Sequence, residues 1–151
     1  EGGWIINVAS MAGHLGLPMG GAYTATKFAV VGLSESWAEE FAGADIHVSV
    51  LCPGFVKTRI HESQRNRPKR YTSENMQKSA TESQELQIKR YVESGMPVEL
   101  VGNRVVEAIA AKELYIFTHS EGFREAVQKR FSGIDTAFAG VSSSQCLSET
   151  P

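Results

Sequence analysis

Ser10, Tyr23 and Lys27 are the residues of this 151-residue chain whose types and spacing could support chemistry. Tyr23 and Lys27 are four residues apart, so they would share one face of a helix. A lysine ammonium beside a tyrosine favours the phenolate form, which makes the phenol a usable general acid or base. The Ser10 hydroxyl could hold a carbonyl oxygen or a developing alkoxide. The same spacing of tyrosine and lysine is also common on ordinary helices, where the lysine is a solvated surface charge. The surrounding residues must therefore distinguish a catalytic pair from a surface pair.

The surrounding segments predict how these side chains are positioned. Periodicity and breaker residues predict a buried strand at 4–9, a Gly-rich loop at 10–21, a helix at 22–41 and a strand at 46–52. This order is a βαβ unit, whose strands are expected to be parallel. Ser10 and the Pro53-Gly54 pair would both follow strand ends. Ligands in such folds bind at the carboxyl ends of the strands, so the chemistry is expected there.

The helix at 22–41 carries an apolar row at four-residue spacing. The row consists of Ala25, Ala29, Leu33, Trp37 and Phe41. Such a row is typical of the face that a helix turns to the protein core. Trp37 and Phe41 could instead belong to an interface between subunits, and the sequence leaves both interpretations open.

The rest of the chain continues the same alternation of helix and strand. Residues 59–96 are polar and too long for a plain connector, and helix could form over 74–93. A helix at 98–112, a strand at 114–118 and a helix at 121–138 follow, with Phe123, Val127, Phe131, Ile134 and Phe138 as the apolar row of the last helix. Residues 141–151 are Ser-rich and are predicted to be a flexible tail. The whole order predicts an α/β fold with a parallel sheet.

Three short motifs strengthen the case for Ser10, Tyr23 and Lys27. They are Asn7-x-x-Ser10-x-x-Gly13, Tyr23-x-x-x-Lys27 with the serine thirteen residues before the tyrosine, and Pro53-Gly54-x-Val56-x-Thr58. Together, and in this order, they strongly resemble the short-chain dehydrogenase/reductase family. The resemblance implies a doubly wound, Rossmann-like parallel sheet and an NAD(P)-dependent oxidoreductase that interconverts an alcohol and a carbonyl.

The resemblance also implies roles for individual residues. Tyr23 would exchange a proton with the substrate oxygen, Lys27 would assist it and contact the nicotinamide ribose, and Ser10 would hold that oxygen. The further residues implied to contact NAD or NADP are Pro53, Gly54, Val56 and Thr58. Met11 and His14 are expected to contact the substrate, together with Ser10. Residues 59–96 would form a lid over the substrate, which closes to exclude water.

One part of the family pattern is absent from this chain. It contains no Gly-x-x-x-Gly-x-Gly turn for the dinucleotide phosphates, nor the residue that would select NAD or NADP. The chain also begins without Met, immediately before an apolar run. We therefore expect it to be the C-terminal half of a longer enzyme. Residues 1–140 would form a partial Rossmann-like domain, with 1–58 as its catalytic strand-helix-strand unit, 59–96 as its lid and 97–140 as a helix-strand-helix. A catalytically incomplete fragment or a non-enzymatic interaction module is the alternative.

Composition limits the other classes of function. The net charge of −2 argues against nucleic-acid binding, and no apolar run approaches the length of a membrane span. Cys52 and Cys146 lie far apart and outside any zinc or redox motif, so we expect no metal and a reducing, cytoplasmic location. A hydrolase with Ser10 as nucleophile would need a Gly-x-Ser-x-Gly or Ser-x-x-Lys motif, which Ser10 lacks. The expected partners are a small alcohol or ketone and, in the full-length enzyme, further copies of the chain in a dimer or tetramer.

Overall fold

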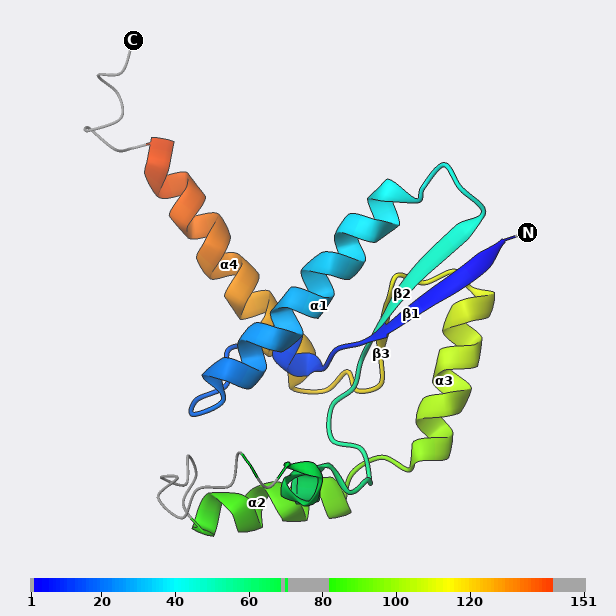
Figure 1. Ribbon diagram of the computed structural model, residues 1–151. Helices are drawn as coiled ribbons and strands as arrows, with labels where there is room; N and C mark the ends of the chain where they lie inside the picture. The colour runs from blue at the N-terminus through cyan, green and yellow to red at the C-terminus, as the bar shows by residue number, and fades with distance from the viewer. Residues whose placement is uncertain (1, 69, 71–81, 143–151) are drawn as a thin grey trace. The chain divides into compact units, whose positions relative to one another are not determined.

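A computed structural model describes residues 2–68, 70 and 82–142 of the chain (Figure 1). Its elements, in chain order, are β1 (Gly3–Val8), η1 (Met11–Gly13), α1 (Gly21–Glu40), β2 (Ile46–Cys52), η2 (Ile60–Asn66), α2 (Glu82–Glu93), α3 (Val98–Ala110), β3 (Tyr115–Phe117) and α4 (Phe123–Ser142). They divide into two compact units, Glu1–Thr118 and His119–Pro151. The first unit contains all three strands of the sheet and all the predicted site residues.

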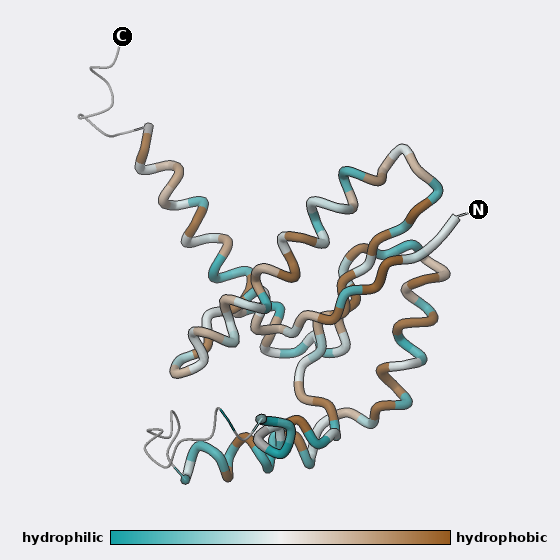
Figure 2. The backbone as a smooth tube through the Cα atoms, in the orientation of Figure 1, coloured by the Kyte–Doolittle hydropathy of each residue, from teal (hydrophilic) through white to brown (hydrophobic). Residues whose placement is uncertain are grey.

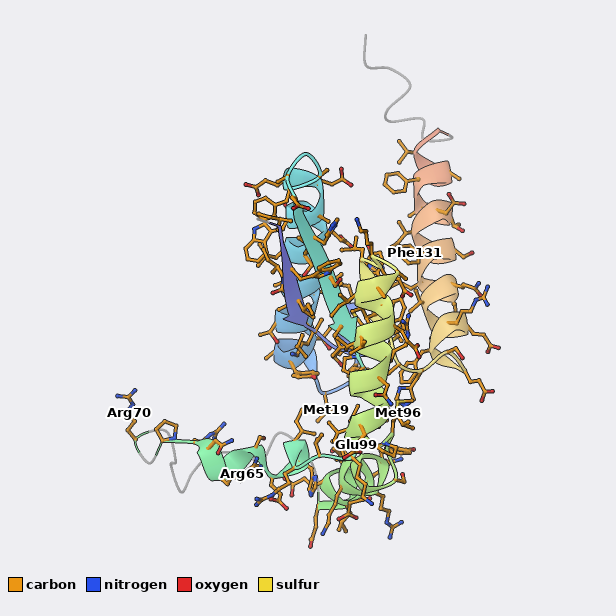
Figure 3. The ribbon with its side chains drawn as sticks, turned by 90° about the vertical axis from the view of Figure 1, so that its right-hand side faces the viewer. Met19, Arg65, Arg70, Met96, Glu99 and Phe131 are labelled. Atoms are coloured by element: carbon orange, nitrogen blue, oxygen red, sulfur yellow. The ribbon has the colours of Figure 1, made fainter. Side chains whose placement is uncertain are left out.

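The sheet is parallel and has the order β1-β2-β3. Gly3 pairs with Ile46 at one end of the first ladder, and Val50 pairs with Tyr115 at the start of the second. Helices α1 and α3 lie on opposite faces of this sheet, as Figures 1 and 3 both show. The predicted α/β class with a parallel sheet is therefore confirmed.

The hydrophobic core is centred on β2, the middle strand. Hydrophobic positions follow the strands, whereas the helices alternate in polarity along their length (Figure 2). The last five residues of β2 are all buried. On one face Leu51 packs with Ile116 of β3 and with Val101 and Ala108 of α3. Ser49 of β2 is also buried, and it is tolerated because its hydroxyl donates a hydrogen bond to the carbonyl of Glu113 at 2.7 Å.

Strand β1 was predicted to be buried, and this prediction is wrong. Trp4, Ile6 and Val8 are 37%, 37% and 57% exposed. Among the described residues β1 pairs only with β2 and so lies at a sheet edge. Val8 shares its face with Leu51, but α3 covers that face over β2 and β3 and does not extend over β1. The apolar sequence of β1 is typical of a strand whose faces are covered, but the described residues leave these side chains exposed.

The predicted apolar row of α1 is also not the buried face of the helix. Ala25, Ala29 and Leu33 are exposed, whereas Val31 and Ser34 are buried. Ser34 is tolerated there because its hydroxyl accepts a hydrogen bond from Asn7 Nδ2 at 3.0 Å and donates one to the carbonyl of Val30. Hydrophobic spacing alone therefore selected the wrong side of this helix.

Two predicted regions fall partly outside the described residues. The helix expected over 74–93 is described as α2 from Glu82, and residues 74–81 lie outside the described part. Helix α4 continues to Ser142, past the expected start of the tail, and residues 143–151 with Cys146 are outside as well. Of the expected apolar row on α4, Phe131, Ile134 and Phe138 are exposed in the second unit. Figure 3 labels Phe131.

Among the described residues, no helix combines the length and the apolar character that crossing a bilayer requires.

Candidate active site

Ser10 lies at the carboxyl end of β1, where the strand turns into η1. The amide of Ala9 still donates to the carbonyl of Leu51 at 2.8 Å, so Ser10 follows directly on the sheet ladder. Its backbone is extended, and its Oγ accepts a hydrogen bond from the amide of Ala12 at 3.2 Å. Serine suits this position because a cap residue must satisfy a free amide of the following turn. The cap fixes the direction of a half-buried hydroxyl.

Gly13 brings this turn into direct contact with α1. A Cβ atom at Gly13 would lie 2.7 Å from Cγ2 of Val31 and 2.8 Å from the carbonyl oxygen of Lys27. No side chain can be accommodated at these distances without moving the helix backbone. The glycine of the first motif therefore sets how closely the Ser10 turn approaches the helix that carries Tyr23 and Lys27.

Lys27 extends from α1 to the end of β1. Its Nζ donates to the carbonyl of Val8 at 3.1 Å, and the same ammonium lies 5.6 Å from the centre of the Tyr23 ring. Tyr23 is 42% exposed, and its carbonyl accepts a hydrogen bond from the Thr26 hydroxyl in the first turn of the helix. Lys27 thus links Tyr23 to the strand end that precedes Ser10. The structure gathers the three predicted residues at the carboxyl end of β1.

The Pro53-Gly54 turn follows β2 and lies beside Ser10. The amide of Met11 donates to the carbonyl of Pro53 at 3.0 Å, which joins the two loops. Beyond β3, the Thr118 hydroxyl accepts a hydrogen bond from the amide of Gly54 at 3.3 Å. The ends of all three parallel strands therefore meet around this turn, as expected for the ligand-binding edge of a parallel sheet.

The last two residues of the third motif are placed at the base of segment 59–96. Val56 forms an isolated parallel bridge with Met96, so its backbone is held in place. Thr58 is exposed, and its Oγ1 accepts a hydrogen bond from the amide of Ile60 at 3.4 Å. The hydroxyl is thus directed by the first turn of η2.

Met11 and His14, which were expected to contact substrate, are both buried. The ring of His14 lies 5.3 Å from that of Phe117 and 5.9 Å from that of Tyr115, centre to centre. Its Nε2 is 3.3 Å from Sγ of Cys52. Contact of these two residues with substrate stays a prediction.

Sequence reasoning missed the polar contacts behind the site. Cys52 is fully buried, and its contact with His14 was not expected from the sequence. Burial raises the pKa of Cys52 to about 11, while a hydrogen bond from the backbone of Ser10 acts in the opposite direction. Burial and a 2.6 Å hydrogen bond to Glu35 raise the pKa of Tyr115 to about 12. The sequence did contain a signal for a role near the site, because Cys52 is the last residue of its strand and so lies at the ligand-binding edge of the sheet.

Across 2–68, 70 and 82–142, no three His, Cys, Asp or Glu side chains are grouped so that they could hold a metal ion.

Comparison with known proteins identifies what this site is similar to. A family model described as short chain dehydrogenase matches residues 1–69. The CLA biosynthesis dehydrogenase/reductase of Lactiplantibacillus plantarum is 34% identical over 137 residues, which is 87% of this chain and 48% of that protein. The C alpha-dehydrogenase of a Sphingobium species is 28% identical over 93% of this chain and 45% of its own length.

A solved structure agrees with these sequence matches. A short chain dehydrogenase/reductase from Burkholderia phymatum, determined in complex with NAD, superposes with a TM-score of 0.83 at 34% identity. The match covers 91% of this chain and 50% of that one. The sheet and its helices therefore have the Rossmann-like arrangement predicted from the motifs, and the chain spans about half the length of these relatives.

Proposed function

Because the chain belongs to the short-chain dehydrogenase/reductase family, we propose that it carries the catalytic residues of an NAD(P)-dependent oxidoreductase. The enzyme interconverts an alcohol and a carbonyl. One observation carries the proposal: Lys27 Nζ reaches the carbonyl of Val8 and lies beside the Tyr23 ring, which brings both side chains to the strand end before Ser10.

The three side chains divide the chemistry at the substrate oxygen. In the direction of reduction, Tyr23 gives its hydroxyl proton to the oxygen as the carbonyl carbon gains hydride, and in oxidation it takes that proton back. The nearby ammonium of Lys27 stabilises the phenolate that remains. Ser10 donates a hydrogen bond to the oxygen, where negative charge develops. A hydroxyl already oriented by the turn of η1 need not reorganise to do so.

A nicotinamide cofactor fits the residues around the strand ends. The cofactor, when bound, supplies or accepts the hydride. Pro53 and Gly54 are half-exposed and offer a surface for the flat ring, and the Thr58 hydroxyl, the Val56 backbone and the Tyr23-Lys27 pair offer polar contacts. The relative from Burkholderia phymatum, which binds NAD, supports this assignment. The choice between NAD and NADP is left to experiment.

The substrate is proposed to be an alcohol or ketone of medium or large size. Apolar side chains are exposed near the site residues, including Leu17, Met19, Phe55 and Tyr91. The ring of Phe55 stacks on that of Tyr91 in α2 with centres 5.0 Å apart. These contacts support segment 59–96 as the lid over an apolar substrate, with residues 1–58 as the catalytic unit and 97–140 as the closing helix-strand-helix. Self-association into a dimer or tetramer and a cytoplasmic location are part of the same proposal.

The decisive experiment replaces Tyr23 by phenylalanine in a form of the protein that oxidises or reduces a nicotinamide. The variant is expected to lose turnover by at least about 100-fold, since the proton donor is removed while the ring remains. Its circular dichroism and melting temperature should stay close to those of the parent. Thr26→Ser, which keeps the neighbouring hydroxyl, is the matched control. Near-parental turnover by Tyr23→Phe would contradict the assignment.

The length of the match favours a second candidate, that this chain alone is catalytically incomplete. Fluorescence titration with NADH and NADPH separates a complete enzyme from an incomplete one. It is performed on these 151 residues and on a form extended to the length of the relatives. Binding by the extended form alone supports incompleteness. Binding and turnover by the short chain argue against it, and absence of turnover in both forms supports a non-enzymatic role.

A further inference from the structure

The buried thiol of Cys52 stands at the junction of the two loops that follow β1 and β2. Cys52 ends β2 directly before Pro53, and His14 follows η1. Both are buried, with Nε2 of His14 3.3 Å from Sγ of Cys52, although the residues are 38 positions apart in sequence. The contact joins the turn that carries Ser10 to the turn that carries Pro53 and Gly54.

His14 and Ser10 are the two ends of one short turn, because they flank η1 on either side. The amide of Gly13 donates to the carbonyl of Ser10 at 2.8 Å, and the amide of His14 donates to the carbonyl of Met11 at 3.0 Å. The amide of Met11 donates to the carbonyl of Pro53 at 3.0 Å. Cys52 therefore contacts His14 at the end of the turn that Ser10 begins. A shift of Cys52 or of the His14 ring would move Ser10.

The His14 ring is itself held in place by β3. Phe117 and Tyr115 flank it at centre distances of 5.3 and 5.9 Å. Tyr115 is fixed in turn by its hydrogen bond to Glu35 of α1. The imidazole is thus held between the aromatic rings of β3 and the sulfur of β2. Such packing is typical of the residues that support a reacting group. A reacting group keeps its productive geometry only when the residues behind it are themselves fixed.

Other functions of a cysteine and histidine pair do not fit this environment. A nucleophilic cysteine is partly exposed and has a depressed pKa, whereas Cys52 is fully buried and its pKa is raised. A metal centre would need further ligands, and within the described residues no group of three is present. The imidazole can act as donor or acceptor toward the thiol, depending on its tautomer, so this contact can form in either case.

We propose that His14 and Cys52 are a positioning pair that holds the Ser10 hydroxyl in its reactive arrangement. The inference rests on the proposed function, because it assigns the pair a purpose only if Ser10 contacts the substrate oxygen. It predicts that breaking the pair lowers kcat while cofactor binding is largely kept.

The test uses His14→Phe and Cys52→Ala in an active form of the protein, with the double variant. Each single variant should lose about 10- to 100-fold in kcat, since a misplacement of about 1 Å has effects of this size. The KM for NADH or NADPH should stay within about twofold of the parent value. Because both changes break one contact, the double variant should be no worse than the poorer single variant. His14→Gln and Cys52→Ser, which restore a hydrogen-bonding group, should recover part of the lost kcat.

A structural control separates positioning from general destabilisation. Val48→Ala creates a cavity in the same buried strand, away from Ser10, and should lower the melting temperature without lowering kcat. The inference is overturned if the His14 and Cys52 variants keep parental kcat, if their effects simply add, or if Val48→Ala lowers kcat equally. A rise confined to substrate KM in His14→Phe would also overturn it and assign His14 to the substrate pocket. Tyr23→Phe is run in parallel, since its failure to lower turnover would refute the proposed function itself.

Discussion

The fold holds the thiol of Cys52 and the phenol of Tyr115 in their neutral forms. Burial is the main cause for both, and it raises the pKa of Cys52 from 9.0 to about 11 and that of Tyr115 from 10.0 to about 12. A group whose folded pKa is raised binds its proton more tightly in the folded state than in the unfolded one. The stability that results is complete below the unfolded pKa and is lost as the pH rises through the folded pKa.

The free energy of unfolding is therefore expected to fall between pH 9 and pH 11, where Cys52 ionises more readily in the unfolded chain. The contribution of Cys52 is on the order of 2 kcal/mol. Cys52→Ser keeps a polar group but removes the titration, so its unfolding free energy should depend less steeply on pH in this range. Urea denaturation of both proteins at several pH values measures the slopes. Equal slopes would show that Cys52 does not titrate as described.

At the scale of elements, two glycines set how closely segments approach one another. Gly13 brings η1 against α1, and Gly95 brings the end of segment 59–96 against the backbone of Phe55. In both cases the nearest atoms include a main-chain carbonyl, which cannot move aside as a flexible side chain can. The relative positions of η1 and α1, and of the two ends of the segment, therefore depend on the absence of a side chain.

Gly13→Ala is expected to lower both stability and turnover. Its Cβ would lie 2.7 Å from Val31 and 2.8 Å from the carbonyl of Lys27, so the η1 turn and α1 must separate. Overpacking of this kind costs about 1–3 kcal/mol, measurable by denaturant unfolding. Gly16→Ala is the matched control because nothing lies within 4 Å of its added Cβ. If the two variants behaved alike, close approach at Gly13 would not be the constraint.

Gly95→Ala is expected to affect substrate binding more than cofactor binding. The added Cβ would lie 2.7 Å from the carbonyl carbon and oxygen of Phe55, which accepts the hydrogen bond from the Met96 amide. Loosening this contact frees the base of the proposed lid, so the substrate KM should rise several-fold while the KM for cofactor changes little. Gly43→Ala, whose Cβ meets no atom within 4 Å, serves as the control in the same steady-state assay. A larger effect on cofactor than on substrate would contradict the lid assignment.

The molecule as a whole could be predicted from sequence where local signals and tertiary packing agree. β2 was predicted with the bounds it has, because its apolar residues alternate with more polar ones and the Pro53-Gly54 pair ends the run. The motif residues Ser10, Tyr23 and Lys27 were identified by spacing, and the parallel order of β1 and β2 followed from the helix between them. These features depend on short stretches of chain.

Burial and long-range contacts could not be obtained in the same way. The apolar row of α1 is as regular as a buried one although Ala25, Ala29 and Leu33 are exposed. The buried Ser34 is satisfied partly by Asn7, which is 27 residues away in sequence. The contact of His14 with Cys52 likewise joins distant positions whose proximity depends on the register of the sheet. Periodicity identifies the elements but does not determine which faces meet.

The uncovered edge of the sheet leads to a prediction for the whole chain. A strand edge with exposed apolar side chains is a template for pairing with other chains. Purified as these 151 residues, the protein should self-associate increasingly with concentration, as measured by sedimentation. Ile6→Lys should weaken this association, whereas Val106→Lys, on the exposed surface of α3, should not. Equal effects of the two lysines would show that net charge rather than the β1 edge governs association.

The bridge between Val56 and Met96 has a consequence for how such a protein diversifies. It joins the two ends of the intervening segment through backbone hydrogen bonds, from the Lys57 amide to Met96 and from the Met96 amide to Phe55. The chain between these ends can lengthen at small cost, because each doubling of a flexible loop adds only about 0.6 kcal/mol of closure entropy. Insertions and exchanges there leave Ser10, Tyr23 and Lys27 where they are. If this segment is the proposed lid, substrate range can change through this segment alone while the proposed catalytic residues are inherited unchanged.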